Sequence, residues 1–352
     1  MGFLPRFARL TGDQGGGSFA ITSTSGTLSH GSSITINGAQ FGTKSPAGPI
    51  IYDDASGTNP ITTGWNTVAP DAAGSPFDLH YTTPATLGRG VSLPHTNITK
   101  YIVGCHRFEA SNQGWNCGLW KMRTVAKPAY TYWSMTHRVD PSWSFSSGDP
   151  ADQNFKYGGL TLDAYYDPAG YWYTNYAGSS WTNNTIEPTH QLYDSAGLGG
   201  SMGIYYGNDN TAGNLASNWL QFEHLYKITI ETDGFVTIIE DGKQMLHYDG
   251  QTDIEPDGTR HDMIGGYARN RGPDQFRYMT DVYLDYTFSR VVLGNASTIG
   301  ACTRREPQVC TAWSSTQITC TMKHGRIPTG SAWLYVFDSS NASTPGFAVT
   351  LV

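Results

Sequence analysis

The feature that most constrains the fold of this chain is a set of β-strands that begins near the N-terminus and stops too early. Residues 33–54 read SITINGAQFGTKSPAGPIIYDD, in which Ile34 and Ile36 alternate with Thr35 and Asn37. This period of two predicts a strand with one buried face, and the turn after it predicts a second strand. Two strands cannot bury a core by themselves, so the remaining strands must come from elsewhere in the chain.

The missing strands are found at the other end of the sequence. Residues 311–352 contain three runs with strand character: residues 317–321 (QITCT), 333–337 (WLYVF) and 347–351 (FAVTL). We therefore expect residues 34–37 to pair with strands from 311–352, in one β-sandwich split by a large insertion. Insertions of this kind are tolerated where the ends of the host lie close together.

Composition predicts an antiparallel all-β protein and excludes some partners. Short runs rich in Thr, Val, Ile, Tyr and Trp are separated by Gly, Pro, Asn and Asp, with 41 glycines in 352 residues. The net charge of -7 argues against nucleic acid as a partner. No apolar run approaches the ~20 residues that span a bilayer, and no Sec-type signal is recognisable, so we expect a soluble chain made without one.

Two stretches resemble known families. ITSTSGTLSHGSSITINGAQFGTK, residues 21–44, resembles the start of an IPT/TIG domain, which is an immunoglobulin-like sandwich. NWLQFEHLYKITIETDGFVTIIEDGKQMLHYDG, residues 218–250, is similar to the meander of a concanavalin A-like (lectin/glucanase) jelly roll, and residues 281–295 resemble the closing strand of that fold. These resemblances imply an antiparallel jelly-roll sandwich inserted into a split Ig-like sandwich. They are scaffold motifs and specify the fold better than the function.

The expected domain organisation has four parts. They are an N-terminal docking arm (1–18), the first part of the Ig-like sandwich (19–54), the jelly roll (55–298) and the second part of the Ig-like sandwich (299–352).

An aromatic stretch is the strongest candidate for a binding site. Residues 162–181 read LDAYYDPAGYWYTNYAGSSW. Aromatic faces stack on sugar rings, so aromatic residues in a jelly-roll groove suit a glycan, although the same residues could fill the sandwich core. The candidate carbohydrate-binding residues are Tyr165, Tyr166, Tyr171, Trp172, Tyr173, Tyr176 and Trp181.

A catalytic alternative rests on three residues. A polyuronate lyase needs a cation to neutralise the substrate carboxylate and a base to remove a proton, and Arg107, His137 and Arg138 could supply them. The other interpretation of Arg107 is a surface pair with Glu109. The clustered carboxylates of laminarinase-type enzymes are absent from the sequence, which argues against hydrolysis of that type.

The sequence also offers candidates for a metal site and for disulfides. Jelly rolls of this class often hold a structural calcium, for which Asp53, Asp54 and Asp285 are candidates; no other cofactor is expected. Five cysteines leave at least one unpaired within the chain. Cys105 with Cys117, Cys302 with Cys310, and Cys310 with Cys320 remain open as pairs.

Taken together, these features resemble bacteriophage virion proteins such as capsid decoration proteins, head fibres and tail adhesins. That resemblance implies a non-catalytic protein that displays a carbohydrate-binding jelly roll. Its partners would be capsid or tail proteins, contacted through the N-terminal arm, and a cell-surface glycan. The protein would be a homo-oligomer or lattice-bound and located in the virion. The alternatives are a polysaccharide lyase or glycanase acting on an acidic capsular or algal polysaccharide, and an extracellular location.

Overall fold

The structure is a computed structural model of the chain, and it consists of antiparallel β-sheets. It describes residues 18–55, 64–65, 105–109, 119–126, 128–139, 154–162, 171–178, 188–194, 218–252, 258–264, 268–269 and 276–352. The only helix in these ranges is the short 3-10 helix η3 (Ile299–Ala301), so no described helix is long and apolar enough to cross a membrane. The expected all-β, antiparallel sandwich class is confirmed.

Two of the four sheets form a small sandwich from both ends of the chain. One sheet has the order β1-β2-β19-β18 and the other β17-β16-β20-β21. The strands are β1 (Ala20–Ser25), β2 (Ser33–Ala39), β16 (Arg290–Gly294), β17 (Arg305–Pro307), β18 (Val309–Trp313), β19 (Gln317–Thr321), β20 (Gly330–Phe337) and β21 (Phe347–Leu351). The pairing expected from the sequence is present, because Ile34 lies opposite Cys320 and Ile36 opposite Ile318. Both isoleucines are buried in the core of this sandwich, as their alternation predicts.

The other two sheets form a large sandwich. Its seven-stranded sheet has the order β12-β11-β10-β6-β15-β3, with β4 also paired to β15. These strands are β3 (Ile51–Asp53), β4 (His106–Glu109), β6 (Ala129–Val139), β10 (Leu220–Ile228), β11 (Gly234–Glu240), β12 (Lys243–Gly250) and β15 (Phe276–Asp285).

The second sheet of the large sandwich is six-stranded, with the order β5-β13-β7-β8-β9 and β14 paired to β7. These strands are β5 (Leu119–Val125), β7 (Asn154–Leu162), β8 (Tyr171–Gly178), β9 (Pro188–Asp194), β13 (Gly258–Ile264) and β14 (Ala268–Arg269). Leu119 and Ile264 of this sheet share a buried core with Trp133 and Phe222 of the seven-stranded sheet.

The junctions between the two sandwiches lie earlier in the chain than the sequence suggested. β3 was expected to close the first part of the Ig-like sandwich, but it pairs with β15, and Ile51 is buried in the core of the large sandwich. Residues 290–294 were expected in the jelly roll, but β16 pairs with β17 and β20 of the small sandwich. Both strands are apolar enough for either core, so composition does not assign them.

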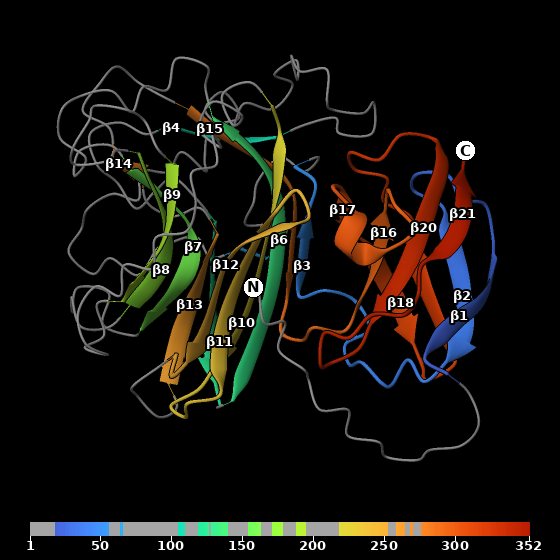
Figure 1. The fold of residues 1–352 in the computed structure, drawn as a ribbon, viewed down its shortest axis with the longest axis horizontal. Helices are drawn as coiled ribbons and strands as arrows, with labels where there is room; N and C mark the ends of the chain where they lie inside the picture. The colour runs from blue at the N-terminus through green and yellow to red at the C-terminus, as the bar shows by residue number, and fades with distance from the viewer. Residues whose placement is uncertain are drawn as a thin grey trace, which may run out of the picture.

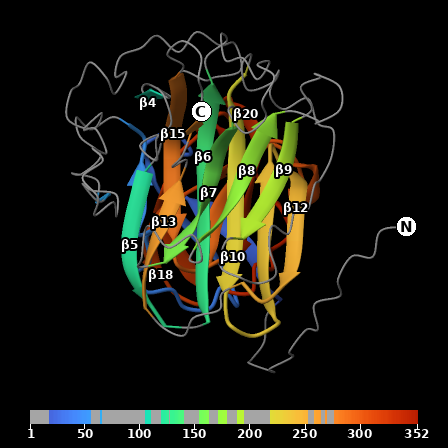
Figure 2. The same cartoon turned by 90° about the vertical axis from the view of Figure 1, so that its left-hand side faces the viewer.

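The sheets are stacked as layers, with the small sandwich against one face of the large one (Figure 1). The seven-stranded sheet lies in the middle, between the six-stranded sheet and the small sandwich. Seen from the left-hand side of Figure 1, β7, β8 and β9 lie in front of the seven-stranded sheet (Figure 2). The six-stranded sheet therefore has one face against the core and another turned away from the small sandwich.

Candidate functional site

The two faces of the six-stranded sheet can be told apart from one buried side chain. Asp262 of β13 is fully buried and accepts hydrogen bonds from Thr131 (3.4 Å) and Tyr226 (3.2 Å) of the seven-stranded sheet. The position of Asp262 is therefore on the inner face. Leu160 lies opposite Asp262, and Trp172 lies opposite Leu160, so these positions share that face.

The predicted aromatic residues divide between the two faces. Because positions alternate along a strand, those of Trp172 and Tyr176 in β8 are on the inner face, while those of Tyr171 and Tyr173 are on the outer one. Tyr165, Tyr166 and Trp181 lie outside the described residues. The register therefore places members of this one stretch on both faces of the sheet.

The register adds positions that the sequence analysis missed. Tyr193 of β9 lies opposite Tyr173, and Gln191 lies opposite Asn175, so all four positions share the outer face. The alternation of residues 188–194 (PTHQLYD) was the available signal, but nothing in the sequence indicated which strand β9 would join. The outer face thus combines tyrosine and amide positions on adjacent strands.

The three candidate lyase residues do not gather at one site. Arg107 and Arg138 both lie opposite Tyr278 of β15, which places these two positions on the same face. The guanidinium of Arg138 lies 5.5 Å from the centre of the Tyr278 ring. His137 is on the opposite face, fully buried, with its ring 5.8 Å from that of Phe222 in the core.

The three carboxylates proposed as calcium ligands bind protein donors instead. Asp53 accepts hydrogen bonds from the backbone N–H of Ala55 (2.9 Å) and from the Trp65 indole (3.0 Å). Asp54 pairs with Lys323 at 3.2 Å, and Asp285 pairs with Lys44 at 2.5 Å. Within the described ranges, no group of three or more His, Cys, Asp or Glu residues is arranged to hold a metal ion.

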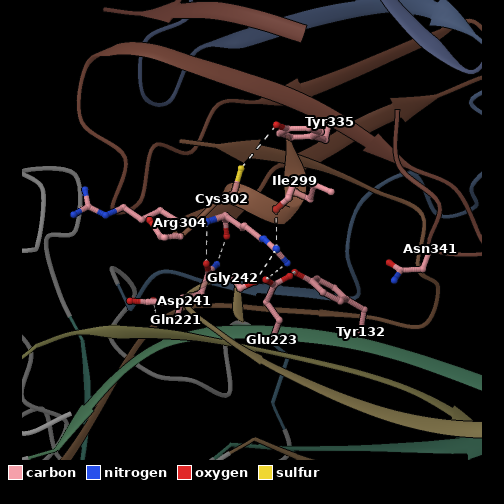
Figure 3. Close-up of polar contacts among 12 residues, drawn as sticks. Tyr132, Gln221, Glu223, Asp241, Gly242, Ile299, Cys302, Arg304, Tyr335 and Asn341 are labelled. Atoms are coloured by element: carbon pink, nitrogen blue, oxygen red, sulfur yellow. Dashed lines mark hydrogen bonds and ion pairs between the residues drawn. The ribbon is translucent and has the colours of Figure 1, made fainter. Parts of the chain in front are cut away.

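A polar cluster lies at the junction between the sandwiches, where Gln221 and Glu223 face Gly242 and Ile299 (Figure 3). Arg305 of β17 is the common partner of these residues. Arg305 donates to Glu223 (3.4 Å) and to the carbonyls of Gly242 (2.9 Å) and Ile299 (2.8 Å). Its backbone N–H donates to the Gln221 amide oxygen at 3.0 Å, and the Gln221 amide nitrogen donates back to the Arg305 carbonyl. Glu223 also accepts a hydrogen bond from Tyr132 at 3.0 Å. This network joins β10 and β6 of the large sandwich to β17.

A tight hairpin extends the junction. β11 and β12 are joined by Asp241 and Gly242, both with positive φ (41° and 79°), as expected for an Asp-Gly turn. The Asp241 carboxylate receives two hydrogen bonds from Arg326, at 2.6 and 3.2 Å. A Cβ on Gly242 would lie 1.6 Å from the Cys302 carbonyl oxygen, so the small sandwich packs directly on the turn.

Arg290 fills the apolar part of the junction. Its guanidinium lies 4.0 Å from the Tyr132 ring centre and 3.8 Å from that of Phe337, one ring from each sandwich. It donates hydrogen bonds to the Phe288 carbonyl (2.8 Å) and to the side chain of Asn341 (2.9 Å). A cation held between two aromatic faces is stabilised where water is excluded.

Two acids at the junction, the buried Glu306 and the half-buried Asp281, have raised pKa values. Burial, together with the charge of Asp281, raises the pKa of Glu306 to about 8, although a hydrogen bond from the Arg326 backbone opposes the rise. Burial raises the pKa of Asp281 to about 6, against the hydrogen bond that Tyr52 donates to it at 2.8 Å. Glu306 is therefore largely protonated at neutral pH, in a site closed to solvent.

The sequence analysis did not predict the junction, which covers the second face of β10. Every residue of β10 is buried except Lys227, so both faces of this strand are covered. An alternating strand with only one buried face would leave Gln221 and Glu223 exposed. Their partners come from distant segments, and neither spacing nor composition connects them. These contacts attach the small sandwich to the seven-stranded sheet of the large sandwich.

Comparisons with known proteins find structural likeness only. No family model matches the sequence, and no curated protein matches it. One similar structure is a mutant of the alginate lyase Aly36B in complex with an alginate trisaccharide. It is 11% identical in sequence, the match covers 52% of this chain and 82% of the lyase chain, and the TM-score is 0.40. An endo-β-1,4-glucuronan lyase from Trichoderma reesei is 10% identical, and the match covers 68% of this chain and 96% of the lyase chain with a TM-score of 0.36. The lectin UEA-II in complex with galactose is 9% identical, and the match covers 52% of this chain and 86% of the lectin chain with a TM-score of 0.31. Scores this low do not assign a function to this chain.

Proposed function

We propose that this protein is a non-catalytic glycan-binding protein that uses the outer face of its six-stranded sheet. One observation carries the proposal: the small sandwich packs on the seven-stranded sheet, so the two sheets of the large sandwich have different roles. One sheet is used for attachment, and we infer that the outer face of the other binds the ligand.

The residue types at this face suit a carbohydrate. Tyr171, Tyr173 and Tyr193 occupy outer-face positions on two adjacent strands, beside Asn175 and Gln191. Tyrosine rings stack on the apolar faces of sugars, and amides both donate to and accept from hydroxyl groups. A row of such positions across neighbouring strands matches the extended shape of an oligosaccharide.

The lyase alternative is less favoured by the geometry. Removing a proton next to a neutralised carboxylate requires the base and the cation on the same side of the sheet. His137 is buried in the core, on the face opposite Arg107 and Arg138. Incubation with a panel of polyuronates, followed by absorbance of unsaturated products, tests this directly. Activity that Arg107→Ala abolishes would overturn the non-catalytic proposal.

Binding is tested with a glycan array, followed by calorimetry on any ligand found. We expect the double variant Tyr171→Ala/Tyr173→Ala to weaken binding at least tenfold while circular dichroism and the melting temperature stay close to wild type. Trp333→Ala is the matched control, because it removes a half-buried aromatic side chain from β20 in the small sandwich. Equal affinity in all three proteins would exclude this face as the site.

The biological setting remains the one proposed from the sequence: display on a bacteriophage virion, with attachment through the N-terminal arm. Residues 1–17 lie outside the described part of the chain, so the support for this setting is the sequence resemblance alone. Co-purification with virions tests the location without assuming any ligand. A protein absent from purified particles would be assigned to the extracellular alternative.

A further inference from the structure

Two of the cysteines lie directly opposite each other in the small sandwich. Cys310 on β18 and Cys320 on β19 are partners in the antiparallel register, and both are free thiols. Both are buried in the core of the small sandwich, in a row with Ile34 of β2. Opposite residues in an antiparallel pair point to the same face of the sheet, so the two thiols face the same core.

The backbone geometry of such a pair fits a disulfide. Opposite residues in antiparallel strands have Cα atoms about 4.5–5.5 Å apart, within the range of about 4.4–6.8 Å that disulfides span. The two thiols also interact: a hydrogen bond that the Cys320 thiol makes to Cys310, and then burial, raise the pKa of Cys320. The register shifts between Cys310 and Ala312, immediately after this pair, so closing a bridge would combine side-chain rotation with adjustment of the backbone at this irregularity.

The other pairs left open by the sequence are less favoured. Cys302 belongs to a different apolar cluster from Cys310, and its thiol lies 3.4 Å from the Thr298 carbonyl and 3.5 Å from that of Ala296. Cys105 immediately precedes β4 of the large sandwich, and Cys117 lies outside the described residues. Of the cysteines that the structure describes, only Cys310 and Cys320 are strand partners.

We propose that Cys310 and Cys320 form a reversible cross-strand disulfide that fastens β18 to the small sandwich under oxidising conditions. β18 is the outer strand of its sheet, paired with β19 on one side only. Outer strands open more easily than central ones. Without the bridge only hydrogen bonds and packing hold β18 on β19, and the bridge would add a covalent link between the two strands. The modification would follow release of the protein from a reducing cytoplasm.

The reaction balances with a small disulfide, such as oxidised glutathione, as the oxidant. The Cys310 thiolate attacks the small disulfide, forms a mixed disulfide and releases one thiol. The Cys320 thiolate then attacks the Cys310 sulfur, closes the bridge and releases the second thiol. Two protein thiols are oxidised and one small disulfide is reduced, with the protons passing to the released thiolates. Because the thiolate is the reactive form, the rate should rise with pH.

Peptide mapping provides the test, because trypsin leaves both cysteines in one peptide, residues 306–323. The folded protein is incubated with oxidised glutathione near pH 8.5, its free thiols are alkylated, and it is then digested. We expect peptide 306–323 to be two hydrogens lighter and free of the alkylating label, while Cys302 is labelled. We also expect the melting temperature to rise by about 5 °C on oxidation and to fall again with dithiothreitol.

Variants separate the bridge from other oxidation products. Cys302→Ser should keep the full temperature shift, whereas Cys310→Ser should lose it, and Cys320→Ala provides the same test if Cys310→Ser folds poorly. The proposal is overturned if the folded wild-type protein keeps both thiols of peptide 306–323 alkylated, or carries only glutathione adducts on them. A bridge that forms without any change in melting temperature would overturn the fastening role.

Discussion

Replacing Glu306 with glutamine should stabilise the protein at alkaline pH. The Glu306 carboxyl group is buried at the junction, where it accepts a hydrogen bond from the Arg326 backbone at 2.9 Å. It lies beside Asp281 and Asp241, and Arg326 is the facing cation. Glutamine keeps the accepting oxygen and nearly the same volume, but it never ionises.

The sign and size of the effect follow from the raised pKa of Glu306. In the unfolded chain this group ionises near 4.5, whereas in the folded protein its pKa is about 8. Between these values the folded state binds more protons, so the free energy of unfolding falls as pH rises. At about 1.4 kcal/mol per pH unit, the full difference corresponds to about 5 kcal/mol, and relaxation of the neighbours should reduce it to about 2–4 kcal/mol.

The assay is urea denaturation at pH 5 and pH 9. We expect Glu306→Gln to match wild type within about 1 kcal/mol at pH 5 and to exceed it by about 2–4 kcal/mol at pH 9. Glu231→Gln is the control, because Glu231 is exposed in the loop between β10 and β11 and should change neither value. The reasoning would be refuted if the free energy of unfolding of Glu306→Gln fell between pH 5 and pH 9 as much as that of wild type. In that case ionisation of Glu306 would not cause the pH dependence.

Two further pairs of substitutions test the packing and the charges of the junction. Gly242→Ala should cost about 3 kcal/mol, because its Cβ would strike a backbone carbonyl at a residue with φ of 79°. Gly31→Ala, with φ of 81° but nothing within 4 Å of the new Cβ, should cost only about 1 kcal/mol. Arg305→Ala should cost about 3–5 kcal/mol in urea denaturation, since it leaves Glu223 buried without its cation. Adding Glu223→Gln should recover part of that loss, and strictly additive costs would contradict a direct interaction between the two.

The strand pattern predicted the fold well where local signals and burial agreed. Alternation at Ile34 and Ile36 identified β2 and its face, and the resemblance of residues 218–250 to a meander agrees with the paired strands β10, β11 and β12. β3 and β16 were assigned to the wrong sandwich, because a short apolar strand fits either core. Local sequence predicts that a strand forms, while its partner depends on contacts across the whole chain.

The candidate site was predictable only in part, for a related reason. Composition identified the aromatic stretch, but only the register separates Tyr173 on the outer face from Trp172 on the inner one. The lyase hypothesis assigned His137 and Arg138, together with Arg107, to one site, although His137 and Arg138 are adjacent in sequence. In a strand, adjacency puts two residues on opposite faces, which is what the structure contains.

The split of the small sandwich has a mechanical consequence. β1 and β21, at the two ends of the described chain, both belong to the small sandwich, and the whole large sandwich is inserted between β2 and β16. A pulling force applied between residues 20 and 351 would be carried by the strands of the small sandwich. The large sandwich would bear no tension until the small one ruptured.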